Sequence, residues 1–255
     1  MGGVAVIIPT LDEAESIGAV VRAIPRTSVA HVIVADGGSR DATAAQAALA
    51  GAEVLHAGRG YGQACLAAAE RAADADILVF MDGDGADDPA SITALVAPIE
   101  AGTHDFVIGS RVRGAREPGS MAWHQIVAGR VAGFMVQRLY GVRYTDMCAF
   151  RAIRRDALLA LGMCELTYGW NLEMQMRAAR AGLRILEVPV PYRCRTGGVS
   201  KVAGNLRGTL RAGTRIISAF VRVLIHPTPP LRGDPPLAGE GGSAGPFMRA
   251  QREEA

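Results

Sequence analysis

Short apolar runs rich in valine and isoleucine alternate with alanine-rich, helix-like stretches along the first 110 residues. The apolar runs predict strands at residues 4–8, 31–35, 53–56, 77–81 and 106–109. The stretches between them predict helices at residues 13–23, 41–50, 62–73 and from Pro89 onward. This alternation is typical of βαβ units, and strands that are apolar throughout belong in a parallel sheet covered on both faces.

The second half of the chain follows a looser pattern. It predicts a long helix at residues 126–140, a strand at 147–153, a helix at 172–181 and a strand at 183–191. Strands joined by longer connections need not stay parallel, so we expect a mixed, mainly parallel sheet. One larger α/β domain fits a length of 255 residues, and we assign it residues 1–202.

The C-terminal part divides into two segments. Residues 203–226 predict an amphipathic helix with Arg207, Arg211, Arg215 and Arg222 on one stripe. Such a helix suits an anionic membrane surface, and a solvated face on a helix packed against the domain or a partner explains it equally well. Residues 227–255 are rich in proline and glycine and predict a disordered tail. No apolar window reaches the length expected of a membrane-spanning helix.

Charge and cysteine usage narrow the class of function. Lys and Arg number 27 against 25 Asp and Glu, a net charge of +2, which is too small to make nucleic acid the main partner. The four cysteines are widely spaced without a CxxC pair, so they indicate neither a zinc site nor a disulfide framework. We therefore expect a cytoplasmic protein whose electrostatic effects are local.

Carboxylates gather directly after the predicted strand at residues 77–81, in the segment DGDGADD at residues 82–88. Ligands of open α/β sheets bind beyond the carboxyl ends of the strands. Asp88 precedes Pro89 and is expected to cap a helix. Asp82 and Asp84 would repel each other in a tight turn unless a cation or strong donors lay between them, and a hard divalent cation fits that position. A solvated acidic turn is the alternative. An EF-hand is excluded because Asp87 stands where its loop requires glycine.

A glycine-rich turn, GRGYG at residues 58–62, lies between a predicted strand and a predicted helix. Its spacing is not GxGxxG and it follows the third strand, so it does not indicate a nicotinamide cofactor. The turn either lets the backbone approach a nucleotide or is a plain tight turn before a helix.

Taken in order, these motifs resemble the family 2 glycosyltransferases of the GT-A fold, most closely the polyprenol (dolichyl) phosphate mannose or glucose synthases. The likeness covers residues 4–205. It rests on the segments IIPTLDE (7–13), DGGSRDAT (36–43), GRGYG (58–62), MDGDG (81–85), GSR (109–111), TDMCAFR (145–151), EM (173–174), EVPV (187–190) and RTGGVSK (195–201). The resemblance implies a Rossmann-like, three-layer α/β/α fold with a mixed, mainly parallel sheet.

The resemblance also implies a nucleotide-diphosphate-sugar donor, a UDP- or GDP-hexose, and an inverting, single-displacement transfer. The base and ribose are expected near Pro9, Leu11, Glu13, Asp36 and Gly62. The diphosphate is expected on Mg²⁺ or Mn²⁺ held by Asp82 and Asp84, on either side of Gly83.

Positive charge is expected to stabilise the departing diphosphate without proton transfer. Arg111, Arg195 and Lys201 supply that charge, and Ser200 lies on the same glycine-containing loop as the last two. The catalytic residues expected are these three cations, Arg111, Arg195 and Lys201, together with the metal ligand Asp84 and the carboxylate Glu173.

The acceptor implied by the resemblance is a polyprenyl phosphate, whose anionic oxygen needs no strong base. A soluble hydroxyl acceptor, such as a small phosphorylated acid or a saccharide, would need a carboxylate such as Glu173 or Asp146 to take the proton. Either carboxylate could instead orient Arg151 or cap a helix.

Two departures from the family pattern, Gly37 and Ala86, keep a third hypothesis open: a non-catalytic nucleotide-sugar-binding partner. With a polyprenyl acceptor, we expect the enzyme on the inner face of the cell membrane, in peripheral contact through the helix at residues 203–226.

Overall fold

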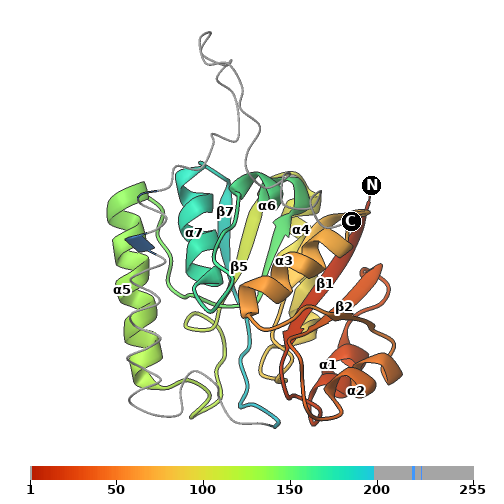
Figure 1. The fold of residues 1–255 in the computed structure, drawn as a ribbon. Helices are drawn as coiled ribbons and strands as arrows, with labels where there is room; N and C mark the ends of the chain where they lie inside the picture. Colours follow the sequence, from red (N-terminus) through yellow and green to blue (C-terminus); the bar gives the residue numbers. More distant parts are fainter. Residues whose placement is uncertain (1, 198–219, 222–224, 226–255) are drawn as a thin grey trace.

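The computed structural model describes residues 2–197, 220, 221 and 225 of the chain. Its centre is a seven-stranded sheet with the order β3-β2-β1-β4-β6-β5-β7 (Figure 1). The strands are β1 (Gly3–Thr10), β2 (His31–Asp36), β3 (Glu53–His56), β4 (Ala75–Phe80), β5 (Phe106–Ser110), β6 (Arg151–Arg154) and β7 (Ile185–Pro189). Ser200 and Lys201, the tail predicted at 227–255 and all but three residues of the segment 203–226 lie outside the described residues.

Strand β6 runs against its neighbours in the described sheet. It pairs antiparallel with β4 and β5, whereas β1 pairs parallel with β2 and β4, β2 with β3, and β5 with β7. The prediction of a mixed, mainly parallel α/β sheet is therefore confirmed. The carboxyl ends of the other six strands share one edge of the sheet, which is where ligands of such sheets bind.

Helices cover both faces of the sheet (Figure 1). Against the strands pack α3 (Tyr61–Arg71), α4 (Ile92–Glu100) and α6 (Arg155–Leu161). Helices α1 (Ile17–Ala23) and α2 (Thr43–Leu49) contact each other near one end of the sheet, and α5 (Trp123–Tyr140) and α7 (Trp170–Arg180) pair at the opposite flank. A short 3₁₀ helix, η1 (Pro89–Ser91), precedes α4, and the Asp88 side chain accepts the Ala90 N–H there as a cap.

The apolar strands form the core because helices shield them on both sides. Val6, Ile7 and Ile8 of β1 are fully buried, and the ring of Phe80 on β4 packs edge-on against Trp170 of α7 with 6.3 Å between centroids. Among the described residues, no helix is both long enough and apolar enough to cross a bilayer.

The second half differs in detail from the sequence expectation. The strand predicted at residues 147–153 begins only at Arg151, because side-chain contacts of Thr145 to Ser110 on β5 and Glu187 on β7 hold the preceding loop. Helix α6 was not predicted. It is seven residues long and starts directly after β6, which leaves too little sequence for a periodic pattern.

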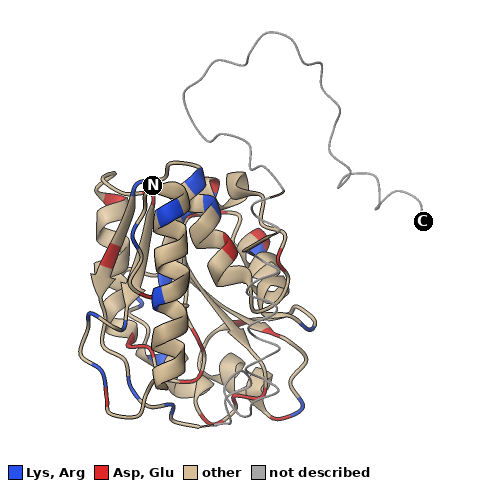
Figure 2. Ribbon diagram, turned by 90° about the vertical axis from the view of Figure 1, so that its left-hand side faces the viewer, with Lys and Arg blue, Asp and Glu red and all other residues tan. Residues whose placement is uncertain are grey.

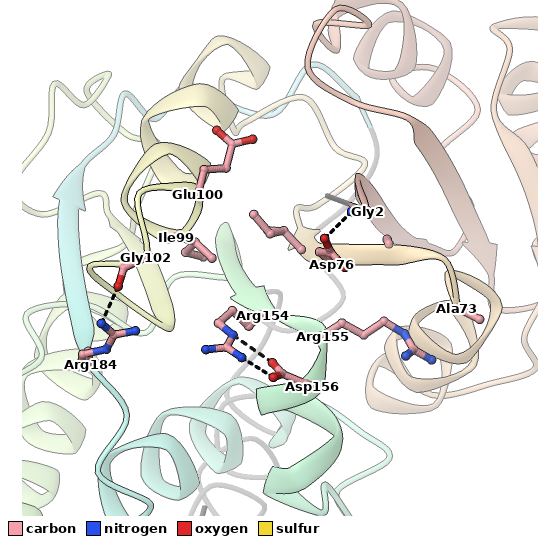
Figure 3. Close-up of a pocket in the computed structure, with 12 residues that line it drawn as sticks. Gly2, Ala73, Asp76, Ile99, Glu100, Gly102, Arg154, Arg155, Asp156 and Arg184 are labelled. Carbon is pink, nitrogen blue, oxygen red and sulfur yellow. Dashed lines mark hydrogen bonds and ion pairs between the residues drawn. The ribbon is translucent and has the colours of Figure 1, made fainter. Parts of the chain in front are cut away.

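A cavity of about 460 Å³ lies at the amino end of β4, away from the shared carboxyl edge (Figure 3). Part of its charged lining is engaged by neighbours: Arg154 pairs with Asp156, and Arg184 donates to the Gly102 carbonyl oxygen over 2.5 Å. Both arginines also contact Asp105, which is buried at the wall. Arg154 and Arg184 are therefore part of a structural ion-pair network beside this cavity.

Asp105 predicts a specific acid sensitivity of the fold. Hydrogen bonds from the Arg184 guanidinium hold the pKa of Asp105 well below its usual range. A carboxyl whose pKa is lowered by folding stabilises the native state above its unfolded pKa near 4, and this contribution fades as the pH falls from there. Asp105→Asn should lower the melting temperature at pH 7 by about 2–4 °C. The gap between variant and wild type should shrink below pH 4 in melting curves followed by circular dichroism. A constant gap down to pH 3 would contradict the assignment.

Candidate active site

The acidic turn after β4 is fixed against the start of α1. The Ser16 hydroxyl donates to the Gly83 carbonyl oxygen over 2.7 Å. A Cβ at Gly83 would lie 2.5 Å from Oε2 of Glu13 and 2.8 Å from Cγ2 of Thr10, so any larger residue would displace these side chains. The structure thus brings Glu13 and Gly83, both predicted from the sequence, together where β1 and β4 end.

The turn holds its carboxylates inside the protein. Asp84 and Asp87 are buried, and Asp82 is partly buried. Burial, with repulsion from Asp84, raises the pKa of Asp82 to about 6. Burial, with repulsion from Asp82 and Asp84, raises the pKa of Asp87 to about 8. A merely solvated acidic turn does not fit this geometry.

Each of these carboxylates has a defined neighbour. The Tyr61 hydroxyl donates to Oδ1 of Asp82 over 3.3 Å, and the Asp82 N–H donates to Oδ2 of Asp87 over 3.2 Å. The Ala86 N–H donates to Oδ1 of Asp84 over 2.9 Å. Tyr61 was not singled out from the sequence, because the GRGYG turn does not reveal where its ring points.

The loop after β7 lies across the acidic turn. The Arg193 N–H donates to the Ala86 carbonyl oxygen over 2.9 Å, and Thr196 donates twice to the Asp84 carbonyl oxygen, each time over 3.2 Å. Gly85 has φ +79°, and a Cβ there would meet the Thr196 hydroxyl at 2.5 Å. The loop places Nε of Arg195 2.9 Å from Oδ2 of Asp84. Arg195, predicted from the sequence, is thus beside the acidic pair.

Arg111 is positioned by Asp146. Its Nε and Nη2 atoms donate to the two Asp146 carboxylate oxygens over 2.8 Å each, and its backbone N–H donates to Oδ2 over 2.9 Å. The guanidinium also lies 5.0 Å from the ring centroid of Tyr192. Glu187 on β7 accepts the Thr145 N–H over 2.8 Å and so fixes the loop that carries Asp146. These contacts hold Arg111 in one orientation at the end of β5.

The hydrogen bonds from Arg111 lower the pKa of Asp146 against the opposing effect of its burial. An acceptor of at least four hydrogen bonds with a lowered pKa is a poor proton acceptor. Asp146 therefore orients Arg111, and the geometry does not support it as a base.

The loops after β1 and β2 interlock at the neighbouring part of the edge. Asp36 is buried and accepts hydrogen bonds from the N–H and hydroxyl of Ser39. The Gly37 N–H donates to the Thr10 carbonyl oxygen over 2.8 Å, and the Glu13 N–H donates to the Thr43 hydroxyl over 2.8 Å. Pro9 is buried in β1 and Leu11 follows it, so the positions predicted for the nucleotide, apart from Gly62, come from adjacent strand ends.

Gly62 and Glu173 belong to one packed unit behind this edge. A Cβ at Gly62 would lie 2.1 Å from the Glu165 carbonyl oxygen, so the backbone of residues 165–166 covers that glycine. Glu173 is fully buried and accepts the N–H groups of Cys164 and Glu165, the latter over 2.7 Å, together with Nε of Arg177 over 2.9 Å. The sequence prediction made Glu173 catalytic, but this geometry makes it an anchor for the segment that packs on Gly62.

Arg151 is held by neither carboxylate that the sequence suggested for it. Its guanidinium is fully buried and donates to the carbonyl oxygens of Cys148, Ala149 and Asn171. Burial lowers the pKa of Arg151. The alternatives in which Asp146 or Glu173 orients Arg151 are therefore wrong, because both carboxylates are committed to other arginines.

The donor set at the acidic turn fits a divalent metal ion. Oδ2 of Asp84 is buried and lies near Arg195 without a directed hydrogen bond, so it keeps a lone pair for a cation. Burial is the main cause of the raised pKa values of Asp82 and Asp87, and repulsion from neighbouring carboxylates adds to it; a cation would relieve that repulsion. Within the described part of the chain, no three His, Cys, Asp or Glu residues form a complete metal site. Mg²⁺ commonly takes one or two carboxylates and completes its shell with substrate phosphates.

The structure thus defines an open α/β protein whose carboxylates and arginines gather at the carboxyl edge of the sheet, where ligands of such proteins bind. The sequence profile of glycosyl transferase family 2 matches residues 5–162, and the chain belongs to this family.

Similar proteins extend the match over most of the chain. A protein named as an uncharacterized glycosyltransferase of Mycobacterium tuberculosis is 40% identical over 212 residues, which cover 82% of this chain and 94% of that one. The polyprenol monophosphomannose synthase of Mycolicibacterium smegmatis is 32% identical, covering 78% of this chain and 81% of the synthase. The undecaprenyl-phosphate mannosyltransferase of Micrococcus luteus is 34% identical, covering 79% and 88%.

Among solved structures, glucosyl-3-phosphoglycerate synthase from M. tuberculosis, in complex with Mn²⁺, UDP-glucose and phosphoglyceric acid, superposes with a TM-score of 0.70. Its identity is 22%, and the match covers 87% of this chain and 79% of that one. This likeness shows that the chain has the GT-A fold, as the sequence predicted.

Proposed function

We propose that this glycosyltransferase transfers mannose or glucose from a UDP- or GDP-sugar to a polyprenyl phosphate, with inversion and with Mg²⁺ or Mn²⁺ bound. The observation that carries the proposal is the meeting of Asp82 and Asp84 with Arg195 at the carboxyl edge of the sheet. The names of two relatives at 32% and 34% identity support the acceptor class.

The residues at the carboxyl edge of the sheet would have different roles in this reaction. Asp82 and Asp84 would hold the metal, which when bound supplies positive charge to the donor diphosphate. Arg195 and Arg111 add fixed positive charge near the leaving group, which a partly dry site makes effective. Pro9, Leu11, Glu13 and Asp36 would contact the base and ribose. Gly62, Ser200 and Lys201 stay predictions of the sequence pattern.

The state of the carboxylates favours a phosphate acceptor. A hydroxyl acceptor needs a base, and both carboxylates considered for that role are engaged, Asp146 by Arg111 and Glu173 by Arg177. A phosphate monoester oxygen is already anionic and needs no proton removed. A soluble hydroxyl acceptor remains the second candidate, because the structural neighbour was crystallised with phosphoglyceric acid.

Product extraction tests the acceptor. With radiolabelled UDP-glucose or GDP-mannose, undecaprenyl phosphate and Mn²⁺, label is expected in the organic phase. Label in a water-soluble product that anion-exchange chromatography separates from the unreacted donor, formed only when phosphoglyceric acid is present, would replace the lipid by the soluble acceptor. Donor binding without turnover on either acceptor would favour the non-catalytic binding partner. A panel of nucleoside diphosphates should raise the melting temperature most for the preferred base.

Membrane contact is part of the same proposal, since a polyprenyl phosphate resides in the bilayer. We place the enzyme on the inner face of the cell membrane. The division into a catalytic domain at 1–202, a basic helix at 203–226 and a tail at 227–255 also stays a proposal.

Tyr61 should affect metal and donor binding through Asp82. Tyr61→Phe removes the hydroxyl that holds Oδ1 of Asp82, and we expect about 3–10-fold weaker Mn²⁺-dependent binding of the nucleoside diphosphate. Tyr144→Phe is the matched control, because its buried hydroxyl donates to the Gln175 carbonyl oxygen over 2.9 Å and touches no carboxylate of the turn. Melting shifts at graded Mn²⁺ concentrations measure both variants. Equal loss of ligand binding in both would show a general packing effect.

A further inference from the structure

Helix α5 turns an apolar face outward. Its inner side is buried along Gly129, Ala132, Gly133 and Val136. A Cβ at Gly133 would lie 2.2 Å from the Tyr144 carbonyl oxygen, so the inner side is seated tightly on the protein. The outer side carries large apolar residues that are exposed: Trp123, Val127, Val131, Phe134, Met135 and Leu139.

These six side chains form a continuous surface. Trp123 is 76% exposed and Phe134 is 62% exposed. The spacing of Trp123, Val127, Val131 and Phe134 places them on one face of a helix that is about 27 Å long. Exposed apolar surface gathered on one element indicates a partner. We call these six residues the α5 face.

The charge of α5 has one sign. Its 18 residues include Arg130 and Arg138, both exposed, and no Asp or Glu. Figure 2, which looks onto this flank, shows Lys and Arg on α5 and no acidic residue along it. At 100° per residue, Arg138 projects in the sector of Val127 and Val131, so positive charge lies within the α5 face itself.

We propose that the α5 face is the surface by which the protein lies on an anionic membrane. Trp123, Val127, Val131 and Phe134 would enter the interface, and Arg130 and Arg138 would contact lipid phosphates. An anionic membrane is favoured as the partner because its negative charge complements the two arginines of α5. A second copy packed through the same face would bring four arginines together without an acidic residue on either helix.

The position of α5 connects this surface to the site. A Cβ at Gly129 would lie 4.0 Å from Oδ1 of Asp146, the carboxylate that orients Arg111. A lipid headgroup on the outer side of α5 would therefore lie about one helix diameter, roughly 10 Å, from the inner side of the helix that faces Asp146. The inference rests on the membrane contact in the proposed function and assigns it to α5, but it does not depend on the identity of the acceptor.

Tryptophan fluorescence of the full-length protein tests the surface directly. The chain has two tryptophans, Trp170 fully buried and Trp123 exposed. Vesicles of phosphatidylcholine with one quarter phosphatidylglycerol should shift the emission to the blue and sediment with the protein, and pure phosphatidylcholine should do so far less. Trp123→Phe should abolish the shift but keep the sedimentation.

Variants separate the apolar and charged contributions. Phe134→Ser should weaken vesicle binding about tenfold, and Arg130→Gln with Arg138→Gln should weaken it by an order of magnitude or more at low salt. Leu49→Ser on α2 is the matched control, because Leu49 is 80% exposed and lies outside the α5 face. It should bind vesicles like wild type.

Three results would overturn the inference. They are unchanged binding by Phe134→Ser, equal binding to neutral and anionic vesicles, and a dimer that Phe134→Ser dissociates while vesicles fail to bind. The outcomes are separable from those of the proposed function. Vesicle binding without lipid-linked product supports the α5 surface and removes the acceptor. Transfer to detergent-dispersed undecaprenyl phosphate without vesicle binding supports the acceptor and removes the α5 surface.

Discussion

Asp84→Asn is expected to lower kcat about 10²–10³-fold while leaving the fold intact. Asp84 is buried at the centre of the carboxyl edge, where one of its oxygens lies beside Arg195 and is free of a directed hydrogen bond. An amide cannot supply the negative charge that, in the proposed function, would hold a divalent cation against the donor diphosphate. Positioned charge of this kind contributes several kcal/mol to a transition state that builds charge on a leaving group. Initial rates at saturating donor, with Mn²⁺ varied, measure the loss.

The stability of the same variant separates a metal effect from damage to the fold. Removing Asp84 also removes repulsion that raises the pKa values of Asp82 and Asp87, so without metal the melting temperature should change by less than about 4 °C. The lost ion pair is with a side chain that is 38% exposed, and such pairs contribute little. Wild type should gain about 5–10 °C from Mn²⁺ and nucleoside diphosphate near 100 times Kd, and Asp84→Asn should gain almost nothing.

Asp88→Asn is the control for Asp84→Asn. It removes one charge from the same turn, and asparagine preserves the helix cap. Its kcat and its response to Mn²⁺ should stay close to wild type. Metal-independent turnover by Asp84→Asn would remove the metal from the proposed mechanism.

The fold was largely predictable because strands that are buried on both faces of the sheet appear in the sequence as short, continuously apolar runs. The strand expected at residues 53–56 coincides with β3, and the other four strands of the first half fall within one or two residues of their observed ends. The reversed direction of β6 was expected only as a general property of longer connections. Its position between β4 and β5 depends on how residues 111–150 pack, and no local pattern encodes that.

Candidate site residues were predictable where a charged side chain comes directly after the end of a strand. Asp82, Asp84 and Arg111 are such residues, and parallel strands bring their ends to one edge. The role of Glu173 was not predictable, because a carboxylate on a helix is judged by its partners, and Cys164 and Arg177 meet it only in the fold. Tyr61 was missed for the same reason: its hydroxyl meets Asp82 across the gap between α3 and β4.

Asp146→Asn should show how far Arg111 depends on its carboxylate. Asp146 is buried and receives two side-chain hydrogen bonds and one backbone hydrogen bond from Arg111, whose side chain is 17% exposed. Breaking a buried pair by removing one partner typically costs about 3–5 kcal/mol, because the remaining charge is left uncompensated. The freed guanidinium would also lose the single orientation in which Asp146 holds it. We expect a clear loss of stability and a fall in transfer of about 10²-fold per folded molecule.

Asp105→Asn is the matched control for that variant, because it also removes a buried carboxylate that binds an arginine through two nitrogens. Asp105 lies at the other end of the sheet, so this variant should lose stability and keep full transfer per folded molecule. Activities normalised to the folded fraction at 20 °C, with the fraction taken from urea unfolding, make the comparison.

If both variants lose transfer only in proportion to unfolding, Arg111 takes no part in the reaction. A selective loss in Asp146→Asn, accompanied by weaker binding of the nucleoside diphosphate, places the positive charge of Arg111 on the donor side. A selective loss with donor binding unchanged places it on the acceptor phosphate.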